Sequence, residues 1–238
     1  MVGARRSPGA GAVKRRRGAV RVAKAKTASS RRWLERQLND PYVQAARDEG
    51  YRSRAAYKLI ELDERFSLLR SGMAVVDLGA APGGWAQIAA QRARVGKARG
   101  LVVAVDLNPI DAIEGVTFIQ ADALDFAVLG PIRAALGGRR ADLVLSDMAA
   151  PATGHTPTDH LRIMALCEAA LDIAEPLLEP GGAFVAKVLK GGTERFLLER
   201  LKRVFRTVKH AKPPASRADS AESYVVALGY RGQGGSSE

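Results

Sequence analysis

The sequence predicts one α/β domain with a seven-stranded, mostly parallel sheet, helices on both faces and an antiparallel strand at one edge. Three observations lead to this prediction. Short apolar runs alternate with helical segments between residues 73 and 205. These runs are apolar throughout, which is typical of parallel strands that are buried on both faces. Two later strands, near residues 207–210 and 224–228, have no helix between them, so we expect them to pair antiparallel at the edge.

Two helices are expected before the first strand. Residues 41–49 begin at Pro41, and proline is favourable at the first helical position. Residues 53–69 carry apolar side chains at helical spacing. Ser53 can cap this second helix at its start, and Ser71-Gly72 ends it.

Four strands and two helices follow in the first half of the domain. Each strand is rich in apolar or β-branched residues, and turn residues separate the segments. The expected strands are residues 73–78, 101–106, 116–120 and 141–147. The expected helices are residues 84–93 and 123–136.

The second half continues this alternation until its final two strands. Pro180-Gly181-Gly182 turns the chain from a long helix into the next buried strand. The expected elements are helix 159–178, strand 183–188, helix 193–205, and strands 207–210 and 224–228, which the polar loop 211–222 joins.

The excess positive charge of the chain lies at its N-terminus. Residues 1–32 contain eleven Lys and Arg and no acid, whereas residues 33–238 contain 26 basic and 25 acidic side chains. Segment 1–32 has few large apolar residues, so we predict a disordered basic tail. A phosphate-binding arm, a solubilising extension and a mitochondrial targeting peptide are open interpretations of it. We expect the folded domain over residues 33–230 and a flexible, Gly- and Ser-rich tail over 231–238.

Composition excludes several classes of protein. The sequence has no run of 18 apolar residues, so no membrane span is expected. Cys167 is the only cysteine, which excludes a disulfide framework and fits a reducing, cytoplasmic compartment. With three histidines besides, the chain offers a poor ligand set for zinc, and we expect no metal site. We expect the protein to be monomeric.

Aspartates stand at or near the ends of four predicted strands. The carboxyl ends of parallel strands meet at one edge of a sheet, and α/β proteins bind their ligands there. We therefore expect a site for polar, partly cationic cargo at this edge. The four aspartates are Asp77, Asp106, Asp122 and Asp147.

The turn at residues 79–84 discriminates between nucleotide ligands. It does not match the G-x-G-x-x-G motif of dinucleotide sites, since Ala81 occupies the middle glycine position. Asp77, just before the turn, would repel a pyrophosphate but suits the ammonium and sulfonium groups of S-adenosylmethionine. We expect Asp106 to accept hydrogen bonds from ribose hydroxyls and Asp122 to accept one from the adenine amino group.

Two residues in apolar surroundings need an explanation. Trp85 follows the glycine-rich turn and is either part of the core or a wall of the ligand pocket. Lys187 lies in the otherwise apolar strand 183–188, where a lysine needs a partner. We expect Lys187 beside Asp147 on the neighbouring strand, although a lysine near a strand end could also extend to solvent. Whether it serves as a base or as an electrostatic stabiliser stays open.

Four segments carry a family resemblance. They are residues 51–59 (YRSRAAYKL), 76–85 (VDLGAAPGGW), 146–149 (SDMA) and 216–224 (SRADSAESY). In this combination the chain resembles the FtsJ-type heat-shock family, ribosomal RNA large-subunit methyltransferase E, over about residues 30–230. The glycine-rich turn alone is shared by many methyltransferases, so the specificity lies in the combination.

The resemblance implies a Rossmann-like, S-adenosylmethionine-dependent methyltransferase. It implies 2′-O-methylation of a uridine ribose in 23S ribosomal RNA, in the peptidyl-transferase A loop, with the large (50S) ribosomal subunit as partner. The catalytic set that it implies is Lys58, Asp147, Lys187 and Glu222. The cofactor contacts that it implies are Gly83, Trp85, Asp106, Asp122 and Asp147.

One segment departs from the family pattern. Many members read SDMAPN, but here Met148 is followed by Ala149-Ala150-Pro151, so the shape of loop 148–154 stays open. Phosphate pairing and stacking make several residues candidate RNA contacts. They are Arg52, Arg54, Tyr57 and Arg217.

Two other classes of methyltransferase fit the sequence less well. A cytosine-C5 methyltransferase needs a nucleophilic cysteine, but Cys167 lies in the middle of a predicted helix among alanines. Amino-group methyltransferases usually have an aromatic residue after the fourth strand, which residues 146–149 lack. Two alternatives stay open: a non-catalytic ribosome-assembly or RNA-binding factor, and a 2′-O-methyltransferase that acts on another RNA.

Overall fold

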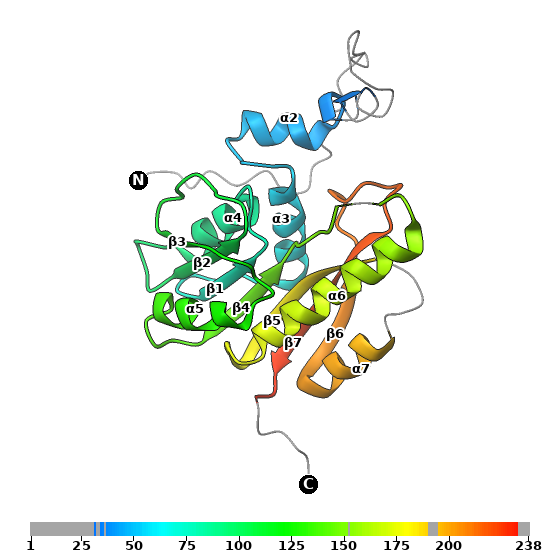
Figure 1. Cartoon of the computed structure of the whole chain (residues 1–238). Coiled ribbons are helices and arrows are strands. Elements are labelled where there is room, and N and C mark those ends of the chain that lie inside the picture. Colours follow the sequence, from blue (N-terminus) through cyan, green and yellow to red (C-terminus); the bar gives the residue numbers. More distant parts are fainter. Residues whose placement is uncertain (1–30, 32–33, 36, 152, 190–194, 233–238) are drawn as a thin grey trace.

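The computed structural model describes residues 31, 34–35, 37–151, 153–189 and 195–232 (Figure 1). Apart from residues 31, 231 and 232, the predicted tails lie outside the described residues. The strands form one seven-stranded sheet in the order β3-β2-β1-β4-β5-β7-β6. They are β1 Ala74–Leu78, β2 Leu101–Asp106, β3 Val116–Gln120, β4 Ala141–Ser146, β5 Leu178–Leu189, β6 Phe205–Ala211 and β7 Glu222–Tyr230.

The predicted strand directions are confirmed. Strands β3, β2, β1, β4 and β5 are parallel to one another. Strand β7 pairs antiparallel with both β5 and β6, so the predicted antiparallel pair stands at one edge and β6 is outermost. Because β7 follows β5 in the sheet, its first residues lie beside the last residues of β5, with Glu222 opposite Leu189.

Helices cover both faces of the sheet, as predicted (Figure 1). On one face α3 and α4 pack on strand residues such as Val75 and Leu143. On the other face α5, α6 and α7 pack on residues such as Val76 and Phe184. The helices are α2 Pro41–Asp48, α3 Ala55–Phe66, α4 Gly84–Ala93, α5 Leu129–Ala135, α6 Thr156–Ala174 and α7 Arg195–Val204.

Helix α3 is shorter than the predicted helix 53–69. Ser67 adopts the left-handed conformation, with φ of 52°, and ends the helix. The chain then folds back, so that the Leu69 amide donates a hydrogen bond to Asp63 Oδ1 at 2.7 Å. The predicted continuation of the helix to Leu69 is therefore wrong.

The predicted helix 123–136 is also wrong in its first half. Residues 126–128 form a single 3₁₀ turn, and α5 begins only at Leu129. Pro131 explains the late start, because proline is tolerated in the first turn of a helix but breaks its interior. The Asp125 carboxylate, which accepts from the Ala127 amide at 2.9 Å, caps the 3₁₀ turn instead.

The predicted helix 159–178 is displaced toward the N-terminus. Helix α6 starts at Thr156, with Pro157 in its first turn, and ends at Ala174. Leu178 instead pairs with Ala141 and opens β5, which is longer than the predicted strand 183–188. Over the described residues, no helix combines the length and the apolar character needed to cross a bilayer.

Candidate active site

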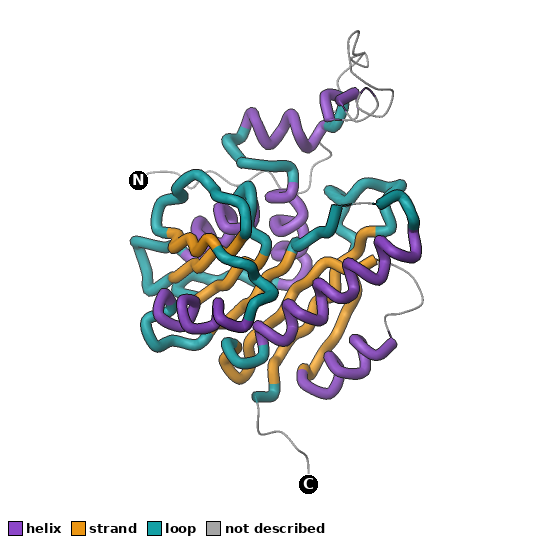
Figure 2. Tube along the Cα trace, in the orientation of Figure 1, coloured by secondary structure: helices purple, strands orange, loops and turns teal. Residues whose placement is uncertain are grey.

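An open cavity of about 330 Å³ lies where the parallel strands end. The loops around it, teal in Figure 2, follow β1, β2, β3 and β4. A cavity therefore lies at the edge of the sheet where the ligand site is predicted. Its lining includes Gly79, Ala81, Asp106, Leu107, Asn108, Asp122, Leu124, Asp147, Met148 and Leu166.

The three predicted cofactor acids, Asp106, Asp122 and Asp147, lie on the wall of this cavity. Asp106 Oδ2 accepts a hydrogen bond from the Ala81 amide at 2.9 Å, and its Oδ1 accepts from the Asn108 amide at 2.8 Å. Asp122 Oδ1 accepts from the Leu124 amide at 2.9 Å. These bonds orient both carboxylates and leave lone pairs for donors of a ligand.

The turn after β1 requires glycine at two positions. Gly79 has a φ of 75°, and a side chain there would collide with Met148. Gly83 has a φ of 103°, and a β-carbon there would come within 2.9 Å of Ile113 Cδ1. Both positions favour glycine because of the left-handed backbone and the close approach of a neighbour.

Trp85 lies in the core rather than on the cavity wall. It is 3% exposed, and its Nε1 donates to the Ala55 carbonyl at 2.8 Å. Its ring packs 5.6 Å from the ring of Tyr224. Neither Trp85 nor Gly83 is among the residues that line the cavity, so their cofactor contacts stay predictions.

Asp77 is fully buried within β1. Burial and the charge of Asp147 raise the pKa of its carboxyl to about 8, and the nearby Ala86 amide offsets this only in part. Burial in β1 therefore favours the protonated form of the Asp77 carboxyl.

The four predicted catalytic residues come together although they are far apart in the sequence. The Lys187 ammonium donates to the Asp147 main-chain carbonyl at 2.8 Å and lies 2.7 Å from Asp147 Oδ1. On the other side, the Lys58 ammonium lies 2.8 Å from Glu222 Oε1 and 3.8 Å from Asp147 Oδ2. Lys187 is 9% exposed, so the possibility that it extends to solvent is excluded.

Asp147 connects the two lysines. Burial alone would raise the pKa of its carboxyl, but Lys187, Lys58 and the hydrogen bonds from Lys187 and Tyr224 outweigh burial and lower it. Asp147 is therefore a carboxylate at neutral pH. Two ammonium groups then face two acids, which keeps a half-buried charged cluster close to neutral.

Tyr224 belongs to this cluster, and the sequence analysis gave it no role. Its hydroxyl donates to Asp147 Oδ1 at 2.6 Å and lies 3.3 Å from Glu222 Oε1. Burial and these two acids raise the pKa of Tyr224 well above its ordinary value, so the phenol stays protonated. The signal available in the sequence was weak: a tyrosine that opens the predicted strand 224–228, two residues after Glu222, needs a partner for its hydroxyl if it is buried.

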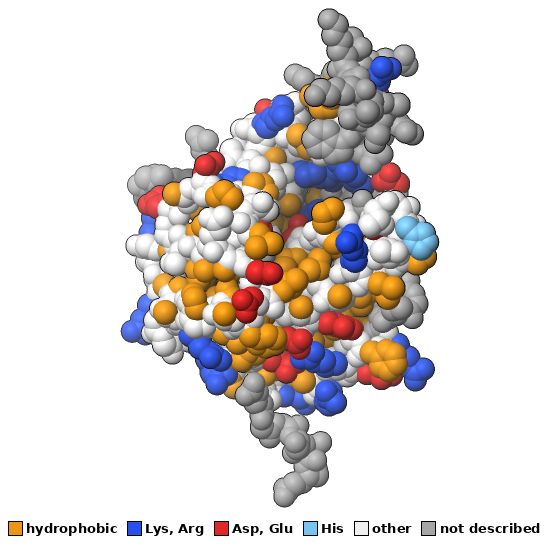
Figure 3. All heavy atoms as spheres, viewed as in Figure 1, with side chains coloured by type: hydrophobic (Ala, Val, Ile, Leu, Met, Phe, Trp, Pro, Cys, Tyr) orange, Lys and Arg blue, Asp and Glu red, His pale blue; other side chains and the backbone are white. Residues whose placement is uncertain are grey.

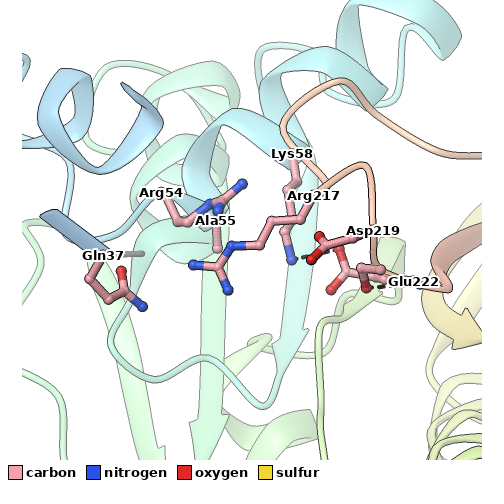
Figure 4. A pocket seen from close by; sticks show the side chains of 8 residues that line it. Gln37, Arg54, Ala55, Lys58, Arg217, Asp219 and Glu222 are labelled. Atoms are coloured by element: carbon pink, nitrogen blue, oxygen red, sulfur yellow. Dashed lines mark hydrogen bonds and ion pairs between the residues drawn. The ribbon is translucent and has the colours of Figure 1, made fainter. Parts of the chain in front are cut away.

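A second cavity, of about 420 Å³, adjoins the cluster at Lys58 and Glu222 (Figure 4). Lys58 and Glu222 lie at its base, whereas Asp147 lines the first cavity. The charged cluster thus separates two hollows. The second cavity is lined by Gln37, Arg54, Ala55, Lys58, Arg217, Asp219, Ser220 and Glu222.

Two of the predicted RNA contacts, Arg54 and Arg217, line the second cavity. Arg54 pairs with the buried carboxylate of Asp40, and Arg217 Nη2 lies 3.5 Å from the same oxygen. The side chain of Arg217 is 30% exposed, and Figure 4 shows its guanidinium reaching across the cavity. In the space-filling view, basic side chains gather beneath α2 beside a hollow (Figure 3).

Arg52 differs from Arg54 and Arg217, because it does not line the second cavity and its guanidinium contacts the segment after β2. It donates to the carbonyls of Asp111 and Ala112 at 2.6 and 2.7 Å. These residues belong to the segment after β2 whose start lines the first cavity. Arg52 therefore fastens this segment, and its RNA contact stays a prediction.

The loop after β4 is anchored by α6. Thr153 donates to Asp159 Oδ1 from its amide at 2.8 Å and from its hydroxyl at 2.7 Å. The Gly154 amide donates to Asp159 Oδ2 at 3.2 Å. Although the loop departs from the family pattern, Asp159 thus fixes its C-terminal part.

Cys167 lies within α6, as predicted, and is a core residue, since it is 1% exposed. In the described part of the chain, no group of three or more His, Cys, Asp or Glu is arranged to hold a metal ion.

The chain is similar to known proteins over most of its length. Residues 51–230 match the family model described as FtsJ-like methyltransferase. The chain is 56% identical over 227 residues to the ribosomal RNA large subunit methyltransferase E of Azorhizobium caulinodans, covering 95% of this chain and 93% of that protein. It is 58% identical over 215 residues to the protein of the same name from Sphingopyxis alaskensis, covering 90% and 91%.

A solved structure is similar over most of the chain. A Plasmodium falciparum protein assigned as a ribosomal RNA methyltransferase superimposes with a TM-score of 0.69 and 31% identity. The match covers 77% of this chain and 100% of that one.

Proposed function

The chain belongs to the FtsJ-like methyltransferase family, and from this premise we propose that it methylates the ribose 2′-hydroxyl of a uridine in large-subunit ribosomal RNA. The observation that carries the proposal is the placement of Lys58, Asp147, Lys187 and Glu222 between two cavities. A donor in one cavity and an acceptor in the other would meet at these side chains.

The first cavity suits S-adenosylmethionine. When bound, this cofactor supplies an electrophilic methyl group on a sulfonium centre. Asp106 and Asp122 would accept hydrogen bonds from its hydroxyl and amino groups, and the glycine turn at 79–84 permits close approach. Asp147, a carboxylate on the cavity wall, would face its positive charge.

The charged cluster suits a weakly acidic hydroxyl as acceptor. The Lys187 ammonium group makes two interactions with Asp147, and these interactions orient it. In the transfer, the ribose oxygen gains a bond to the methyl carbon as the carbon–sulfur bond breaks, and the hydroxyl loses its proton. We assign Lys187 as the proton acceptor, a role that requires its ammonium group to release one proton to solvent before the transfer, with Lys58 as the cation that stabilises the electron-rich oxygen.

Glu222 has a positioning role in this proposal. Its Oε1 holds the Lys58 ammonium at 2.8 Å and accepts from the Ser216 hydroxyl at the same distance. Lys58 would keep its position only approximately without Glu222, so replacement of Glu222 should cost less than replacement of Lys187.

The second cavity suits the target nucleotide. Arg54 and Arg217 line it beside Lys58 and offer donors for phosphate or base oxygens. The choice of large-subunit RNA rests on the name that the relatives share. The 50S subunit as substrate, the cytoplasmic location and the monomeric state are predictions of the same proposal.

The test uses ribosomal particles that have not been modified. Purified protein is incubated with labelled S-adenosylmethionine and either 50S subunits or free 23S RNA from cells that lack the protein, and 2′-O-methyl groups are mapped. Label on one uridine ribose that is lost with Lys187→Ala is the expected result. Tight binding to the particle without label would favour the non-catalytic alternative, and label on another RNA alone would reject the proposed substrate.

A further inference from the structure

The loop between β6 and β7 is tied to α3 through one residue, Ala215. The Ala215 amide donates to Glu61 Oε2 at 2.7 Å, and its carbonyl accepts a hydrogen bond from Arg54. Both side chains project from the start and the middle of one helix segment, and Ala215 is fully buried. Two side chains thus satisfy both backbone groups of one loop residue.

Glu61 makes a second tie. Its Oε1 accepts from the Tyr42 hydroxyl at 3.1 Å, so the same carboxylate also joins α2 to α3. Lys212 also belongs to this loop, and its ammonium group donates to the carbonyls of Ala218 and Ser220. These contacts lie within the loop, so they do not attach the loop to α3. Among the described contacts, the hydrogen bonds of Ala215 with Glu61 and Arg54 join loop 212–221 directly to the α3 segment, and the Arg217–Asp40 pair joins it to the start of α2.

From Ala215 a short path leads to the charged cluster. The next residue, Ser216, is 5% exposed and donates to Glu222 Oε1 at 2.8 Å. The same oxygen holds the Lys58 ammonium. Lys58 lies three residues before Glu61 on α3, so the helix carries one partner of the Lys58–Glu222 pair and, through Ala215 and Ser216, fixes the other.

We propose that Glu61 is a positioning residue for methyl transfer, which acts by holding Ala215 so that Glu222 meets Lys58. This inference rests on the proposed function, because it assumes that the charged cluster is the reacting site. Glu61 does not line either cavity and touches no group that we assign to the reaction. Its effect therefore passes through Glu222.

The experiment compares Glu61→Ala with Glu61→Gln in the full chain. Glutamine keeps an acceptor for the Ala215 amide and a donor for Tyr42, so it should restore near-normal turnover, whereas alanine should lower kcat about tenfold, the effect expected of a misplaced catalytic pair. Glu64→Ala is the matched control, since Glu64 lies exposed on the same helix. The Kd for S-adenosylhomocysteine should stay unchanged in all three variants.

A kinetic double-mutant cycle separates positioning from general destabilisation. In a Glu222→Ala background, Glu61→Ala should have less than about a twofold further effect, because the path that it disrupts is already cut. An equal fold-loss of kcat in both backgrounds, or wild-type turnover in Glu61→Ala, would overturn the proposal.

Amide exchange gives a readout that does not need the substrate. Exchange at residues 211–222 should be faster in Glu61→Ala than in wild type or Glu61→Gln, and unchanged exchange would overturn the proposed tie. If wild type transferred no methyl group to any ribosomal RNA, the proposed function itself would fail, whatever the exchange result.

Discussion

Lys187 meets Asp147 twice, at the side-chain carboxylate at 2.7 Å and at the main-chain carbonyl at 2.8 Å. One residue at the end of β4 thus fixes the ammonium group of a residue on β5. This double contact explains how a lysine is held in an apolar strand, because its charge is paired with a carboxylate and two of its N–H groups have acceptors. It also leaves one ammonium direction for a third partner.

Replacement of Lys187 by alanine should remove methyl transfer without removing the cofactor. Loss of a group that accepts a proton is expected to lower kcat by about 10²- to 10⁴-fold. The Kd for S-adenosylhomocysteine, measured by calorimetry, should change less than about twofold. Lys209→Ala, at an exposed lysine of β6, serves as the control. Turnover near the wild-type value in Lys187→Ala would show that the assignment of the proton acceptor is wrong.

Asp77 should make the ligand-free protein less stable as the pH rises. The pKa of the Asp77 carboxyl is raised in the folded protein to about 8, from an ordinary value of 3.8. The folded state therefore binds one more proton than the unfolded state between these values, and stability falls there by at most about 1.4 kcal/mol per pH unit. Below the unfolded pKa this contribution is fully present.

Asp77→Asn provides the matched measurement. Asparagine cannot ionise, so the free energy of unfolding of this variant relative to wild type should increase from pH 5 to pH 8 in urea titrations. A constant difference between the two proteins over this range would mean that Asp77 is already ionised in the folded state.

Arg52→Ala should weaken cofactor binding rather than RNA binding. Arg52 holds the carbonyls of Asp111 and Ala112, and its Cδ would be 3.0 Å from a β-carbon at Gly83. Release of this segment should raise the Kd for S-adenosylhomocysteine about five- to tenfold, as expected for two lost charge-assisted hydrogen bonds on a partly exposed group. Arg47→Ala, at an exposed arginine of α2, is the control. If only the KM for RNA rises, Arg52 is an RNA contact after all.

Arg217→Gln should weaken RNA binding while cofactor binding persists. Arg217 is partly exposed at the second cavity and shares the Asp40 carboxylate with Arg54. If its guanidinium contacts a phosphate, the slope of log K against log salt should become shallower by about one. Filter binding of labelled 23S RNA between 50 and 200 mM salt measures this slope. An unchanged slope with unchanged affinity would place the RNA elsewhere.

Much of the sheet could be predicted from local pattern. Strands β2 and β3 occupy the predicted residues 101–106 and 116–120, and α4 occupies 84–93. Their apolar runs and the glycine turn at 79–84 act over a few residues, so the neighbouring sequence is sufficient. Helix ends were less predictable, because a backbone turn such as that at Ser67 depends on what the following residues pack against.

The strand pattern predicted that Lys187 lies beside Asp147, but Lys58 and Glu222 could be identified only by the family resemblance, and the structure then supplied the geometry of all four. Nothing in the local sequence relates Lys58 to Glu222, which lie 164 positions apart, yet their charged atoms are 2.8 Å apart. Tyr224 and Glu61 were missed for the same reason. Their partners come from other segments, and single residues of these types are ordinary in a strand or a helix.

By itself the sequence determined the fold class, the parallel strands and the acids at their ends, because apolar periodicity and turn residues are local properties of the chain. Only the tertiary structure decided that Asp77 is buried inside β1, that Trp85 packs in the core and that Arg52 holds the segment after β2. Burial and partner choice depend on segments that meet after folding, and free energies of desolvation and hydrogen bonding are set by those contacts.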